Sequence, residues 1–115
     1  MKGNLSDQAR INHIYDAINE IGNYVNNVSY YDFSKSSEKK FASVKQLEII
    51  GEAASRITKQ TKLNHPEVEW VKIIALRNIL VHEYYVIDEQ VLWNIITKDL
   101  PSLKNQIISL ISKMK

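Results

Sequence analysis

Apolar residues in the first quarter of the chain recur at alternating steps of three and four positions. The residues at these steps are Ile11, Ile14, Ile18, Ile21, Val25 and Val28. Because an α-helix completes a turn every 3.6 residues, this spacing places all of them on one stripe of a helix. We therefore predict a helix over about residues 6–27, whose apolar stripe packs against a partner helix.

A second apolar pattern follows the polar stretch at residues 30–37. Its apolar positions are Phe41, Val44, Leu47, Ile50, Ala54 and Ile57. We predict that the polar stretch breaks the helical period and that its serines cap a second helix, because serine side chains accept hydrogen bonds from free backbone N–H groups. Gly51, inside this second helix, is expected to let a neighbouring helix approach closely.

The second half of the chain predicts three more helices. The run Asn64–Pro66 indicates the start of a third helix over about residues 66–84, since asparagine can cap a helix and proline is tolerated in its first turn. That helix is apolar on nearly every side, so we expect it to be the most buried element. Asp88 is expected to cap a fourth helix, and Pro101 to separate or kink off a last one.

Signals for β-structure are missing from the sequence. Only three glycines and two prolines interrupt the chain, and it holds no Asn-Gly or Asp-Gly pair and no sustained alternation of apolar and polar residues. We therefore predict an all-α fold, namely an antiparallel four-helix bundle with an additional C-terminal helix. Residues 1–115 are expected to form one domain.

Composition and charge exclude several classes of function. The chain has no cysteine, which removes disulfides, thiolate nucleophiles and cysteine zinc sites. Fifteen Lys and Arg against thirteen Asp and Glu leave a formal charge of +2, so any anionic substrate must be held by local charge. Neither a signal-peptide core nor an apolar run long enough to cross a bilayer is present, so we expect a cytoplasmic protein without membrane association.

Metal and cofactor sites are not expected either. No two histidines have the spacing of metal ligands. His13 lies in the middle of the first helix and His65 precedes Pro66, so a surface or capping role is expected for both.

Polar side chains interrupt the apolar segment at residues 77–84. An unpaired buried charge costs several kcal/mol, so Arg77 must be paired, face water or await an anionic ligand. On an ideal helix Asn78 and His82 share a face, whereas Arg77 and His82 differ by about 140° and about 7.5 Å of rise. The two side chains can therefore reach one phosphate only by side-chain curvature, by unwinding of the helix or by pairing across a dimer. This separation favours a site between two protomers, in which each protomer supplies an arginine and a histidine.

A structural role for the same residues is the alternative. His82 near a helix C-terminus can complement the helix dipole, and Arg77 can be neutralised by Glu48 or Glu52, one turn apart on the second helix. Tyr84 can be an amphipathic residue at the edge of the core. Spacing alone favours this structural interpretation.

Several segments resemble one known family. The segment 77–84 resembles the Arg-x4-His-x-Tyr motif of the HEPN superfamily, and specifically its HepT-like (DUF86) branch. The run Ile49–Ala53 is similar to the second-helix signature of that branch, Trp70 and Ile73 precede the arginine as they do there, and the run Asp99–Leu103 follows as it does there. Length and helix order agree from end to end. The main departure is Glu83-Tyr84-Tyr85, which adds an acidic group beside the motif.

The resemblance implies the toxin half of a toxin–antitoxin system. Such a protein is a metal-independent endoribonuclease that works as a homodimer and cleaves RNA through attack by the 2′-hydroxyl. The resemblance implies that Arg77 and His82 are catalytic, that Asn78 orients the imidazole or donates to the phosphate, and that Glu52 supports the arginine. The expected product carries a 2′,3′-cyclic phosphate.

The resemblance also implies a protein partner. In this branch a small (MNT-type) nucleotidyltransferase acts as the antitoxin by adding AMP to the motif tyrosine, which matches Tyr84. A catalytically silent helical adaptor, which binds a nucleotidyltransferase or a nucleotide, is the alternative function. Four lysines near the start of the second helix form either a solvated face or a track for an RNA backbone. They are Lys35, Lys39, Lys40 and Lys45.

Overall fold

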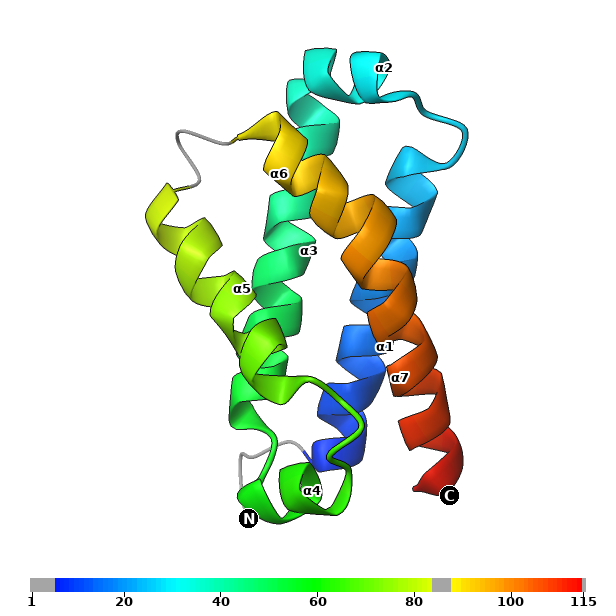
Figure 1. Cartoon of the computed structure of the whole chain (residues 1–115), viewed down its shortest axis with the longest axis vertical. Coiled ribbons are helices and arrows are strands. Elements are labelled where there is room, and N and C mark those ends of the chain that lie inside the picture. The colour runs from blue at the N-terminus through cyan, green and yellow to red at the C-terminus, as the bar shows by residue number, and fades with distance from the viewer. Residues whose placement is uncertain (1–5, 84–87, 115) are drawn as a thin grey trace.

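The computed structural model describes residues 6–114 apart from residues 84–87, and for residues 78–83 it describes the backbone only. In this part of the chain every regular element is a helix, which confirms the predicted all-α bundle. Helical rods run alternately up and down (Figure 1): α1 (Asp7–Val25), α3 (Ser37–Arg56), α5 (Trp70–Glu83), and a bent rod of α6 (Glu89–Asn94), η2 (Ile95–Asp99) and α7 (Leu100–Lys113). The short helices α2 (Tyr30–Lys35) and α4 (Lys59–Asn64) lie at opposite ends of the bundle.

Helix α1 forms as its spacing predicts. Ser6 caps it, because the serine oxygen accepts a hydrogen bond from the Ala9 N–H at 3.0 Å. Beyond the helix, Asn27 adopts a positive φ of 60°, a conformation that asparagine tolerates better than most residues. The predicted apolar stripe is confirmed over its buried members Ile11, Ile14, Ile18 and Ile21. Val25 is the last residue of the helix, and Val28 lies beyond it.

The polar stretch at residues 30–37 follows the end of α1 and breaks its period as predicted, but it also forms a short helix that the sequence did not predict. Most of it forms the helix α2, which Ser29 caps by accepting a hydrogen bond from the Asp32 N–H at 3.1 Å. The fully buried Phe33 anchors this short helix, with its ring centroid 5.0 Å from that of Trp93. The capping role of the serines is confirmed, because Ser36 caps α3.

The predicted second helix corresponds to α3, with two differences at its ends. Phe41 is 50% exposed instead of buried, because it lies away from the centre of the buried stripe. Ile57 is buried but terminates the helix as its C-cap, in an extended conformation.

The predicted start of the third helix at Asn64–Pro66 is wrong. Asn64 ends the helix α4 and His65 is its C-cap, so the segment stops one helix and does not begin the next. Pro66 lies in the turn that follows, a common position for proline after a helix end. Helix α5 begins only at Trp70, whose indole N–H donates to the His65 carbonyl at 3.0 Å.

Helix α5 is less uniformly buried than expected. Within its described side chains, Ile73 and Trp70 are buried, but Val71 is 84% exposed. Although the sequence of α5 is apolar on nearly every side, the first turn of the helix is therefore partly exposed to solvent. No helix in the described part of the chain is long and apolar enough to cross a membrane.

The last rod bends at a widened turn before Pro101. Asp88 caps α6 as predicted, by accepting hydrogen bonds from the N–H groups of Gln90 and Val91. The turn η2 is π-helical, and the Leu100 N–H donates to the Ile95 carbonyl five residues before it. Proline has no N–H and its ring clashes with the carbonyl four residues earlier, so a widened turn accommodates Pro101 without ending the helix. The predicted break is therefore a bend in a continuous rod.

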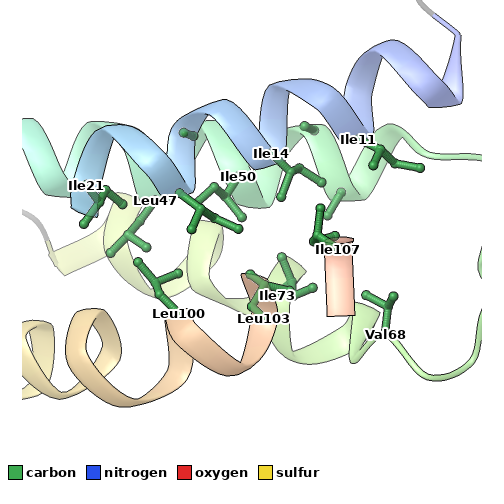
Figure 2. Packing of buried hydrophobic residues seen from close by; sticks show 14 of the residues in the cluster. Ile11, Ile14, Ile21, Leu47, Ile50, Val68, Ile73, Leu100, Leu103 and Ile107 are labelled. Atoms are coloured by element: carbon green, nitrogen blue, oxygen red, sulfur yellow. The ribbon is translucent and has the colours of Figure 1, made fainter. Parts of the chain in front are cut away.

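Side chains from α1, α3, α5 and α7 meet along the bundle axis. Figure 2 shows branched apolar side chains from these helices, and Val68 from the turn before α5, filling the space between the rods. Each fully buried side chain of this kind contributes about 1.5–3 kcal/mol of transfer free energy. The labelled members are Ile11, Ile14, Ile21, Leu47, Ile50, Val68, Ile73, Leu100, Leu103 and Ile107.

The predicted close approach at Gly51 is confirmed. A Cβ atom built on Gly51 would lie 2.5 Å from the Arg77 Cβ and 2.9 Å from the Arg77 backbone nitrogen. Because two of the nearest atoms belong to the α5 backbone, only glycine lets α3 and α5 cross at this distance. This crossing places Arg77 against the C-terminal half of α3.

Candidate functional site

Arg77 is held by side chains of α3 on the turn next to Gly51. Its Nη1 donates to Glu52 Oε1 and to Ser55 Oγ, both at 3.0 Å. The Arg77 side chain remains 32% exposed. Of the two carboxylates expected to neutralise the arginine, Glu52 makes the ion pair. The guanidinium is therefore paired and oriented while part of it stays at the surface.

Glu52 joins two guanidinium groups. Its Oε2 accepts a hydrogen bond from Arg56 Nε at 2.6 Å, one turn further along α3. The hydrogen bonds from Arg56 and then from Arg77 hold the pKa of the Glu52 carboxyl below its ordinary value, against the opposing effect of desolvation. The carboxylate is therefore ionised at neutral pH, and the cluster of Arg56, Glu52 and Arg77 carries one net positive charge.

The remaining predicted site residues lie on α5 or just beyond it. The α5 backbone is helical through Glu83, so positions 78 and 82 share a face and positions 77 and 82 differ by about 140°. The side chains of Asn78 and His82, and the whole of Tyr84, lie outside the described residues.

A cleft of about 420 Å³ runs along α3 beside Arg77. Ile49 and Ala53 contribute apolar surface to its lining. Four of its lining residues are Arg or Lys and two are Glu, an excess of two positive charges. The full lining comprises Arg10, His13, Lys45, Glu48, Ile49, Glu52, Ala53, Arg56 and Arg77.

Sequence reasoning missed two members of this cleft, Arg10 and Arg56. Neither belongs to a recognisable motif, and Arg10 lies on a different helix from the motif arginine. The sequence places Arg10 and His13 three residues apart and so on one face of the first helix, but this spacing does not show that the face meets Arg77. The expected surface position of His13 is confirmed, since it is exposed.

The four lysines near the start of the second helix, which could form a basic track, have different surroundings in the structure. Lys40 forms an ion pair with Glu89 at 2.7 Å, and Lys35 lies over the ring of Tyr31 at 5.4 Å from its centroid. Lys45 alone among the four lines the cleft beside Arg77. Within the described residues, no group of three or more histidine, aspartate or glutamate side chains is arranged to hold a metal ion.

Comparisons with known proteins agree on one family. A family model described as ribonuclease HepT-like matches residues 14–110. A protein of Thermococcus cleftensis named probable ribonuclease HepT is 37% identical over 93 residues, which cover 81% of this chain and 84% of that protein. A protein of Methanocaldococcus jannaschii, provisionally named an RNase, is 33% identical over 94 residues, which cover 82% and 86% of the two chains. No solved structure matches the chain significantly.

Proposed function

The chain belongs to the ribonuclease HepT-like family, and from that premise we propose that it is a metal-independent endoribonuclease whose active site is shared by two protomers. The observation that carries the proposal is the setting of Arg77. Two α3 side chains, Glu52 and Ser55, orient its guanidinium, and it forms part of the wall of an open cleft with excess positive charge. A guanidinium held in this way suits an anionic phosphodiester.

The proposed reaction is a transesterification within the RNA strand. A base removes the proton of a 2′-hydroxyl, the 2′-oxygen attacks the adjacent phosphorus, and the bond to the 5′-oxygen breaks. An acid protonates the departing 5′-oxygen, which leaves a 2′,3′-cyclic phosphate and a 5′-hydroxyl. Arg77 stabilises the negative charge that develops on the phosphorane oxygens. DNA lacks the attacking hydroxyl and is not cut.

A site shared by two protomers would account for the angle between Arg77 and His82 on α5. Positions 77 and 82 differ by about 140° around the α5 axis, so the two side chains of one protomer leave the helix in different directions. A two-fold axis beside α5 would bring two copies of His82 to one cleft, one as the base and the other as the acid. Asn78 lies one helical turn before His82 on the same face, where it orients the imidazole or donates to the phosphate.

Regulation by nucleotide transfer is the second part of the proposal. Tyr84 follows the motif histidine by two residues, and its phenolic oxygen is the proposed acceptor of AMP. The oxygen attacks the α-phosphorus of ATP, which a partner nucleotidyltransferase binds, and pyrophosphate leaves. The adduct adds bulk and negative charge close to the RNA site, so substrate and modification compete for Arg77. On this account the chain is the toxin and the nucleotidyltransferase the antitoxin.

One observation favours the alternative of a catalytically silent adaptor. The ion pair between Arg77 and Glu52 is what a structural role for the arginine requires. In that case Arg77 fixes the crossing of α3 and α5, and the chain does not cleave RNA.

The deciding experiment incubates the purified protein with an end-labelled RNA in the presence of EDTA. We expect cleavage that leaves a 2′,3′-cyclic phosphate, and a loss of about 10²–10⁴-fold in His82→Ala. A substrate with 2′-deoxyribose at the cleaved position should stay intact, because it lacks the attacking 2′-hydroxyl, and His82→Ala purified in the same way controls for a contaminating ribonuclease. A folded dimer that cuts no RNA would favour the adaptor.

A further inference from the structure

The residues that line the cleft beside Arg77 carry a net positive charge. The whole chain has a formal charge of +2, and the residues that line the cleft have the same excess. The rest of the sequence is therefore neutral in sum. The excess positive charge of the cleft attracts an anionic polymer that approaches this surface.

The cationic side chains of the cleft come from three helices. Arg10 belongs to α1, Lys45 and Arg56 to α3, and Arg77 to α5. Lys45 and Arg56 are eleven residues apart, which corresponds to about 16 Å along α3. Charges spread over that length suit a strand with several consecutive phosphates better than a single small anion.

Two of these cations have a different role from the other two. Arg56 and Arg77 are bound to Glu52, so their charge is partly compensated and their position is fixed. Arg10 and Lys45 lie in the same cleft, and neither forms a hydrogen bond to Glu52. Lys45 is exposed to solvent, as is His13 on α1. These side chains are placed to contact a ligand that enters from solution.

We propose that this cleft binds the single-stranded RNA segment next to the cleaved bond, and that Arg10 and Lys45 hold its phosphates. The inference rests on the proposed function, because it takes RNA as the substrate. Ile49 and Ala53 give the cleft an apolar part on which a ribose or base can lie. The imidazole of His13 supplies a further hydrogen-bonding group beside Arg10. Because Arg10 and Lys45 contact the phosphates of the RNA backbone, they raise the affinity for RNA without selecting a nucleotide sequence.

Binding is measured by the fluorescence anisotropy of a labelled single-stranded RNA. All proteins carry His82→Ala, so that the RNA stays intact. The test variant adds Arg10→Gln and Lys45→Gln, which leave the Glu52 cluster unchanged. The control variant adds Lys59→Gln and Lys98→Gln, two exposed lysines outside the cleft, and so removes the same charge. Circular dichroism and gel filtration confirm that both variants keep the fold and assembly of the parent.

We expect the test variant to bind RNA about tenfold more weakly near 0.1 M salt. The slope of log K against log salt should be smaller by about 1.4 for this variant, which is the value for two lost phosphate contacts on a single strand. The control variant should keep the affinity and slope of the parent to within about twofold. Equal binding by the two variants would overturn the inference, as would a parent that does not bind RNA.

Cleavage by the protein with an intact His82 is measured separately and reports on the proposed function alone. If RNA is cut but binding is insensitive to Arg10 and Lys45, the inference fails and the ribonuclease assignment stands. If binding depends on the cleft but no RNA is cut, the ribonuclease assignment fails, and only the binding of single-stranded RNA through Arg10 and Lys45 stands.

Discussion

Gly51 of α3 and Arg77 of α5 lie so close that a Cβ atom on the glycine would come within 2.5 Å of the Cβ of the arginine. The glycine therefore sets the distance between the two helices at the level of the candidate site. The next residue along α3, Glu52, then meets the arginine head group at 3.0 Å. Two neighbouring residues of α3 therefore fix both features: Gly51 sets the spacing of the helices, and Glu52 orients the guanidinium of Arg77.

Gly51→Ala should destabilise the protein by about 1–3 kcal/mol, because the added methyl group meets backbone atoms of α5 and the helices must move apart. The displacement of Arg77 should also lower RNA cleavage. Gly22→Ala is the matched control, since a Cβ there meets nothing within 4 Å and should stabilise α1 by about 0.5–1 kcal/mol. Urea unfolding measures both changes. Equal stability of Gly51→Ala and the wild type would contradict the account of the crossing.

The Glu52 cluster predicts how stability responds to acid. The hydrogen bonds from Arg56 and Arg77 lower the pKa of Glu52 in the folded state, so the unfolded state binds the proton more readily. The contribution of the carboxylate is therefore present above the ordinary pKa of 4.5 and is lost as the pH falls below that value. The wild type should exceed Glu52→Gln in stability at neutral pH, and the difference should shrink in acid. A difference in stability that stays constant with pH would show that ionisation of Glu52 does not contribute to the stability of the fold.

Asp7 ties the start of α1 to α4. Its carboxylate accepts hydrogen bonds from the Thr58 N–H and from the hydroxyls of Thr58 and Thr61. Desolvation raises the pKa of Asp7, but these hydrogen bonds more than offset it and hold the pKa below 3.8. Asp7→Ala should cost about 1–2 kcal/mol in urea unfolding. Asp16→Ala, an exposed carboxylate on the same helix, is the control and should change stability by less than about 0.5 kcal/mol.

On the proposed regulation, Tyr84 should gain AMP when the chain is coexpressed with the nucleotidyltransferase proposed as its partner. Intact-mass and peptide mass spectrometry should find the adduct on Tyr84, and the modified protein should lose RNA cleavage because the adduct places negative charge near Arg77. Tyr84→Phe should escape both modification and inhibition, whereas Tyr85→Phe, one residue further on, should behave as the wild type. An unmodified Tyr84 in the coexpressed protein would contradict this mode of neutralisation.

The sequence predicted the helices where apolar periodicity is regular and failed where local signals are ambiguous. The stripe from Ile11 to Ile21 has one geometric interpretation, since only a helix places these residues together. Asn64 and Pro66 allow two interpretations, because asparagine occurs at both helix ends and proline follows a helix end as readily as it enters a first turn. The tertiary contact of Phe33 with Trp93 stabilises α2, and these two residues are far apart in the chain.

The candidate site was predictable only where its residues belong to one motif or one helix turn. Spacing on the second helix offered Glu48 and Glu52 as equal partners for Arg77, and packing at Gly51 selects Glu52. Arg10 joins the site only after α1 packs on α3, a relationship that no local pattern encodes. Long-range packing therefore supplies the part of the cleft that the sequence does not reveal.

The central claim is RNA cleavage at a site that needs His82 from both protomers, and it is tested most directly with mixed dimers. Wild type is co-refolded with increasing shares of His82→Ala, and cleavage of an end-labelled RNA in EDTA is measured at constant total protein. If both histidines act in one cleft, only fully wild-type dimers cut, so an equal mixture keeps about a quarter of the activity. A linear decline, with about half of the activity at the equal mixture, or no cleavage by the wild type itself, would contradict the account.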